Sequence, residues 1–170
     1  MKREVLNSKN VNFIGCWKIE NDKLFTGLID FFENNPQLQK RGVIGSGIDS
    51  EKKKTTDITI DPNSLKNKNF SIFNDYFEEL FKCYKDYRTQ WPFLIENIKS
   101  VDIPSFNLQK YIPGDHFSKL HTERNRSTQI HRVFAWMSYL NNIKEDNGNT
   151  CFPHFDLKVK PARGKTLIWP

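Results

Sequence analysis

A histidine and a carboxylate two residues apart are the strongest candidates for chemistry in this chain of 170 residues. They are His121 and Glu123, in the segment Lys119-Leu120-His121-Thr122-Glu123. On an extended strand such side chains point to the same face, and an imidazole nitrogen and a carboxylate oxygen can bind one divalent metal together. Any surface strand can carry a histidine and a glutamate at this spacing. Whether the pair indicates a metal site therefore depends on the neighbouring residues.

Two tyrosines lie in segments that flank the pair. A strand expected over 105–112 alternates, so that Gln109 and Tyr111 share a polar face suited to line a cavity. The segment 133–141 is apolar on both faces, which predicts a central strand with Tyr139 in an otherwise apolar pocket. A buried phenol needs a hydrogen-bond partner, and either an anionic ligand or a backbone carbonyl would serve.

The elements that must position these residues form a helical part and a strand-rich part. Apolar residues at helical spacing predict helices over 24–34 and 71–91, the second with one broad apolar stripe that we expect to pack against a sheet. Alternation and turn residues predict strands over 12–19, 55–60, 105–112, 117–123, 133–141, 149–152, 156–160 and 165–169.

This order of elements predicts an α+β fold, with helices on one face of an antiparallel sheet, sandwich or barrel. No repeat or flexible linker divides the chain. We therefore expect a single domain over 1–170, with 1–104 mainly helical support and 105–170 the β core. A hydrophobic content of 37% is enough to build that core.

The formal net charge of +6 would suit an anionic partner. Only Lys52, Lys53 and Lys54 form a run, within an irregular loop over 42–54, and the other cationic residues are scattered. We attribute the charge mainly to compositional bias and do not expect nucleic acid as a partner, although an anionic substrate stays open.

The remaining sequence features concern location and redox state. No apolar run is long enough to cross a membrane, and residues 1–10 do not resemble a signal peptide, so a cytoplasmic protein without a membrane partner is expected. Cys16, Cys83 and Cys151 have no CxxC spacing, so each is expected to be a small buried apolar residue.

The order of motifs along 105–170 resembles the prolyl 4-hydroxylase-like branch of the 2-oxoglutarate- and iron(II)-dependent dioxygenases. Each motif is common by itself, but their order is specific, whereas residues 1–104 agree only in having helices before the β core. The motifs are Tyr111-Ile112-Pro113-Gly114, His121-Thr122-Glu123, Arg132 with Tyr139-Leu140-Asn141, Gly148-Asn149-Thr150-Cys151-Phe152-Pro153, Val159-Lys160-Pro161, and Gly164-Lys165-Thr166-Leu167-Ile168-Trp169-Pro170.

The resemblance implies a double-stranded β-helix (jelly-roll) core with N-terminal supporting helices. It implies that His121 and Glu123 are catalytic and are the first two ligands of an iron(II) facial triad. Tyr111 and Tyr139 would bind the co-substrate 2-oxoglutarate, with Arg132 at the edge of that site. The reaction would couple release of succinate and CO₂ to hydroxylation of an unactivated C–H bond, such as that of a prolyl residue, with ascorbate as a possible accessory reductant.

Two departures from the family pattern bear on this expectation. Glu123 stands where the family usually has aspartate, and the extra methylene changes the reach of the carboxylate. The distal histidine and the basic residue that pairs with 2-oxoglutarate lie, in the family, beyond the strand that ends here at Trp169-Pro170. We therefore expect a fragment that is inactive by itself, with His116, His131 and His154 as surface or loop residues.

Two other functions stay open from the sequence. One is a non-catalytic jelly-roll module that binds a small ligand, and the other is a cupin-like metal protein that does not use 2-oxoglutarate. Peptides, proteins and small molecules are all candidate substrates, and the oligomeric state is not determined.

Overall fold

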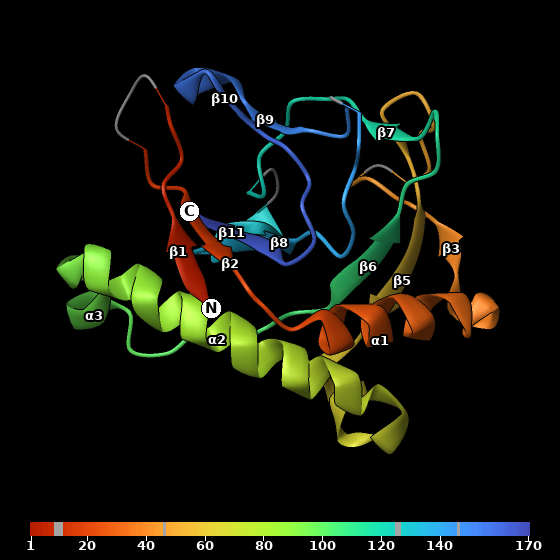
Figure 1. Ribbon diagram of the computed structural model, residues 1–170, viewed down its shortest axis with the longest axis horizontal. Coiled ribbons are helices and arrows are strands. Elements are labelled where there is room, and N and C mark those ends of the chain that lie inside the picture. The colour runs from red at the N-terminus through yellow and green to blue at the C-terminus, as the bar shows by residue number, and fades with distance from the viewer. Residues whose placement is uncertain (9–11, 46, 125–126, 146) are drawn as a thin grey trace.

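Two amphipathic helices, α1 (Asp22–Glu33) and α2 (Ser71–Gln90), lie along one side of the molecule (Figure 1). The structure is a computed structural model that describes residues 1–8, 12–45, 47–124, 127–145 and 147–170. Asn21 caps α1, because its side chain accepts a hydrogen bond from the Leu24 amide at 3.1 Å. Both helices confirm the prediction from apolar spacing.

A third helix, α3 (Pro92–Asn97), follows α2 almost directly and was not predicted. The helix predicted over 71–91 ends at Gln90, and Pro92 then occupies the first turn of α3. Proline is tolerated there because its missing N–H has no partner within the helix. Short 3-10 helices span Pro36–Leu38, Pro62–Lys66, Lys68–Phe70, Ser127–Gln129 and Pro153–Phe155.

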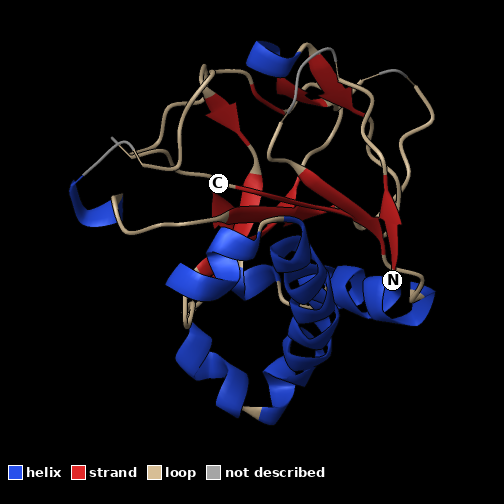
Figure 2. Ribbon diagram, turned by 90° about the vertical axis from the view of Figure 1, so that its left-hand side faces the viewer, coloured by secondary structure: helices blue, strands red, loops and turns tan. Residues whose placement is uncertain are grey.

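The strands pair antiparallel and lie as a second layer over the helices (Figure 2). The architecture is therefore α+β, as predicted, and the described strands form no closed barrel. The largest sheet has the order β1 (Lys2–Glu4), β2 (Gly15–Lys18), β11 (Lys165–Trp169), β8 (Ala135–Ser138). The others are β3 (Lys40–Arg41) with β5 (Thr56–Ile60) and β6 (Phe106–Lys110), β4 (Lys53–Lys54) with β7 (His116–Phe117), and β9 (Thr150–Phe152) with β10 (Leu157–Val159).

Strands from the first 104 residues and from the rest of the chain share the same sheets. β2 pairs with β11, and β5 pairs with β6 over five residue positions from Thr56↔Lys110 to Ile60↔Phe106. The N-terminal part therefore contributes strands as well as supporting helices to the described fold.

The main hydrophobic core lies between the helices and the two larger sheets. Trp17 and Phe25 have no exposed surface, and the apolar stripe of α2 packs into this core as predicted. Phe106 and Leu108 of β6 pack against the same core, whereas Gln109 bonds to Asp57 on the other face of the sheet. The alternation predicted for β6 is confirmed.

β8 lies at an edge of its sheet, so the prediction of a central strand is wrong. The segment is apolar on both faces because the strand separates two hydrophobic clusters. Trp136 packs on the helical core, and Met137 and Tyr139 pack on a second cluster that includes Leu157 and Leu167. A strand with both faces apolar therefore needs a hydrophobic cluster against each face, but it does not need a hydrogen-bonded strand on each side.

The cysteines divide into two buried residues and one exposed residue. Cys16 and Cys83 are buried, as expected, and burial is the main cause that raises the pKa of each thiol to about 12. Cys151 is exposed, which contradicts the prediction, because it occupies the outward position of β9 in a two-stranded hairpin. None of the described helices is long and apolar enough to cross a membrane.

Candidate metal centre

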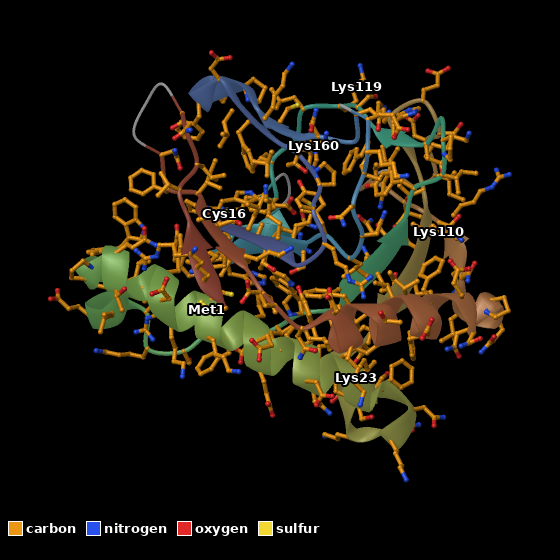
Figure 3. The ribbon with its side chains drawn as sticks, viewed as in Figure 1. Met1, Cys16, Lys23, Lys110, Lys119 and Lys160 are labelled. Atoms are coloured by element: carbon orange, nitrogen blue, oxygen red, sulfur yellow. The ribbon has the colours of Figure 1, made fainter. Side chains whose placement is uncertain are left out.

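His121 and Glu123 lie on a loop, so the strand predicted over 117–123 is wrong beyond its first residue. β7 ends at Phe117, because its partner β4 is only two residues long. Local hydrogen bonds then replace the ladder, since the Thr122 hydroxyl accepts from the Arg124 amide at 3.3 Å. Figure 3 shows Lys119, just before this pair, on the side of the molecule away from α2.

The loop nevertheless brings the two side chains together. Nε2 of His121 lies 3.7 Å from Oε1 of Glu123. Two metal–ligand bonds of about 2.1 Å each can span up to about 4.2 Å, so one ion can reach both atoms. The geometry that spacing on a strand predicted is thus produced by a turn.

A second contact fixes which nitrogen of His121 is available. Nδ1 lies 2.9 Å from the carbonyl oxygen of Lys119. A carbonyl can only accept, so Nδ1 carries the proton, and the lone pair of the neutral imidazole is on Nε2, facing Glu123. Histidine ligands of metals usually have this second hydrogen bond, which sets their tautomer and ring orientation.

Arg132 joins the pair through the other oxygen of Glu123. Its Nη1 lies 3.6 Å from Oε2 of Glu123. The side chains of His121, Glu123 and Arg132 are 41%, 37% and 35% exposed, so an ion or small molecule can reach them from solvent. The guanidinium holds one carboxylate oxygen and leaves the other directed at His121.

The two tyrosines expected to bind 2-oxoglutarate have partners within the protein. Tyr139 donates to the Thr150 hydroxyl at 2.6 Å, and desolvation is the main cause that raises its pKa to about 12. The shorter bond is to a side-chain hydroxyl, but the Tyr139 hydroxyl also lies 3.4 Å from the carbonyl oxygen of Val159, so a backbone carbonyl, one of the two partners expected from the sequence, is present as well. The hydroxyl of Tyr111, a residue 46% exposed, lies 3.5 Å from Oε1 of Gln109.

The structure brings no third ligand to the pair within the residues it describes, where no group of three His, Cys, Asp or Glu side chains could hold a metal. His131 and His154 are exposed. Nε2 of His116 lies 3.1 Å from the carbonyl oxygen of Glu51. The donor set present therefore fits two positions of a metal site.

A buried ion pair next to this site was missed from the sequence. Nζ of Lys53 lies 2.6 Å from Oδ2 of Asp57, and both side chains are almost fully buried. The lysine run had been assigned to an irregular loop, but Lys53–Lys54 forms strand β4. No sequence signal marked this pair, because Asp57 alternates with the core residues Ile58 and Ile60 and is therefore expected on the polar face of the strand.

Asp57 is also bonded by neutral donors. The Thr55 hydroxyl donates to its Oδ1 at 2.7 Å, and Gln109 Nε2 donates to its Oδ2 at 3.1 Å. Lys53 and Thr55 also line an open cavity of about 360 Å³. The polar face predicted for β6 therefore belongs to a network that continues across β5 to β4.

In comparisons with known proteins, no family model, curated protein or solved structure matches the chain. The geometry of the described residues is therefore what bears on function.

Proposed function

We propose that this chain carries the first two iron ligands of a 2-oxoglutarate- and iron(II)-dependent dioxygenase, an enzyme that hydroxylates an unactivated C–H bond and releases succinate and CO₂. The observation that carries the proposal is the separation of 3.7 Å between His121 Nε2 and Glu123 Oε1, with His121 Nδ1 bonded to a backbone carbonyl. Iron(II) bound by these two atoms would supply the oxidative chemistry.

The roles of the protein residues follow from their contacts. His121 would supply Nε2 and Glu123 would supply Oε1 to the metal, while Arg132 holds the other oxygen of Glu123. Tyr139 would bind a co-substrate carboxylate by exchanging its bond to Thr150, and Tyr111 would do so by exchanging its weaker contact with Gln109. The substrate is a peptide, a protein or a small molecule.

A jelly-roll core is part of the proposal. The arrangement of the two larger sheets over α2 supports it. The ring of Phe77 on α2 lies 5.0 Å from Phe106 of β6 and 6.2 Å from Trp136 of β8. β6 and β8 are both at the edges of their sheets.

Manganese(II) titration followed by nuclear magnetic resonance tests this function without requiring turnover. We expect Mn²⁺ to broaden the ring signals of His121, and 2-oxoglutarate to tighten Mn²⁺ binding, since it adds oxygen ligands to the same ion. His121→Ala and Glu123→Ala should each abolish binding. His131→Ala is the matched control, because His131 is exposed and should leave binding unchanged. Binding that survives His121→Ala would disprove the assignment.

The second candidate is a cupin-like metal protein that does not use 2-oxoglutarate. The hydrogen bond from Tyr139 to Thr150 favours it, because the hydroxyl expected to bind the co-substrate already has a partner. In that case Mn²⁺ binds at His121 and Glu123, but its affinity does not respond to 2-oxoglutarate. A ligand-binding module without a metal would show neither effect.

A further inference from the structure

The Lys53–Asp57 pair is unusual among the ion pairs of the described residues. Their side chains are 4% and 6% exposed, whereas every other such pair has at least one partner that is 21% exposed or more. Removing two charges from water is costly, and apolar residues of similar size are often as stabilising as a buried ion pair. Such a pair is therefore better explained by the geometry that it fixes than by stability.

The buried pair fixes the position of Lys53 relative to Phe117. The antiparallel register of β4 and β7 places these two residues opposite each other. Nζ of Lys53 lies 5.7 Å from the centroid of the Phe117 ring, within the range of a cation–π contact. Because Asp57 holds Nζ at 2.6 Å, the ammonium group has little freedom to move relative to the ring.

Phe117 in turn contacts the candidate metal ligand. Its ring is stacked on the imidazole of His121, with centroids 4.1 Å apart and an interplanar angle of 15°. Stacking restricts the plane of the imidazole, and the bond from Nδ1 to the Lys119 carbonyl restricts its rotation within that plane. Together these contacts direct Nε2 at Glu123.

We propose that Phe117 is a positioning residue for His121, and that the buried Lys53–Asp57 pair is the brace that holds Phe117 in place. The proposal rests on the proposed function in giving His121 a metal to bind. The ring orientation itself does not depend on a metal, so it can be measured in the metal-free protein.

The test of Phe117 is the tautomer of His121, read from proton–nitrogen correlation spectra of the ring at a pH where it is neutral. Wild-type protein should show the form protonated at Nδ1. Phe117→Leu, which removes the ring, should give a mixture of the two tautomers and about 10- to 100-fold weaker Mn²⁺ binding. Phe117→Tyr keeps the stacked ring and should retain both properties. An unchanged His121 spectrum in Phe117→Leu would overturn the proposal.

The test of the brace uses Lys53→Met/Asp57→Asn, which removes both charges with little change in side-chain volume and keeps an amide oxygen that can accept from Thr55. We expect its His121 spectrum to resemble that of Phe117→Leu. The matched control is Lys54→Met, on the same strand, whose ion pair with Asp115 involves a lysine side chain that is 54% exposed. It should leave His121 unchanged. A folded double variant with the wild-type His121 spectrum would refute the brace.

Failure of this inference is distinguishable from failure of the proposed function. If the tautomer shifts as expected but wild-type protein binds no Mn²⁺, the positioning contacts stand and the metal assignment fails. If Mn²⁺ binds at His121 and Glu123 but Phe117→Leu changes neither the spectrum nor the affinity, the metal assignment stands and the positioning role fails.

Discussion

The helical core and the His121 loop are built on different physical principles. In the core, large side chains such as Trp17 and Phe25 have no exposed surface, and their positions follow from apolar area removed from water. At the site, His121 and Glu123 on the loop and Arg132 farther along the chain are each more than a third exposed and are held by a few polar contacts and one stacked ring. Stability and site geometry should therefore respond to different mutations.

The largest effect is expected in the core. Trp17→Ala removes a fully buried indole and its bond of 2.7 Å from Nε1 to Asp86, so the free energy of unfolding should fall by about 3–5 kcal/mol. Urea denaturation measures this loss. Phe93→Ala is the control, since Phe93 is 68% exposed and its loss should change stability by about 0.5 kcal/mol or less. Similar losses for the two variants would contradict the location of the core.

Alanine substitution of two glycines with similar φ angles allows a direct comparison of a position in the core with a position in an open turn. Gly164 (φ +79°) packs against the core, where an added Cβ would lie 2.2 Å from the carbonyl oxygen of Ile19. Gly114 (φ +87°) lies in the turn before β7, with no atom within 4 Å of such a Cβ. Both alanine variants acquire backbone strain, of about 1–3 kcal/mol. Gly164→Ala should lose more stability than Gly114→Ala because of the contact with Ile19. Equal unfolding temperatures of the two variants would contradict this prediction.

Tyr139 links the second cluster to the proposed co-substrate site. Tyr139→Phe removes the donor to Thr150, so unfolding free energy should fall by about 0.5–1.5 kcal/mol even without ligand. Because the pKa is about 12, the hydroxyl is expected to remain a protonated donor throughout the neutral range. Tyr111→Phe is the comparison, because the Tyr111 hydroxyl has only a contact of 3.5 Å with Gln109 and should contribute less. Denaturation of both variants tests this order.

The smallest effect on stability is expected at the loop itself. His121→Ala and Glu123→Ala should each change the free energy of unfolding by about 0.5 kcal/mol or less, because both side chains are partly exposed. The same variants should lose Mn²⁺ binding. A large loss of stability in either would show that the pair is structural, and would remove the distinction between the two regions.

The local pattern of the sequence determined the helices α1 and α2, the two faces of β6 and the proximity of His121 and Glu123. These features depend on spacing along one segment, which periodicity reports directly. The stripe on α2 could bury only by packing against other elements, and it does so against both larger sheets. The prediction of a strand over 117–123 was wrong, yet the two side chains still meet, because a turn can also bring residues two apart together.

Only the tertiary structure decided which elements became neighbours. The apolar character of β8 did not distinguish a central strand from an edge strand between two cores. The lysine run did not indicate that Lys53 would be buried against Asp57 and next to Phe117. Asp57 is only four residues from Lys53, but β4 pairs with β7 and β5 pairs with β6, and both of these partner strands come from a distant segment of the chain. Such pairings leave no periodic signal in either segment, so they appear only when the whole chain has folded.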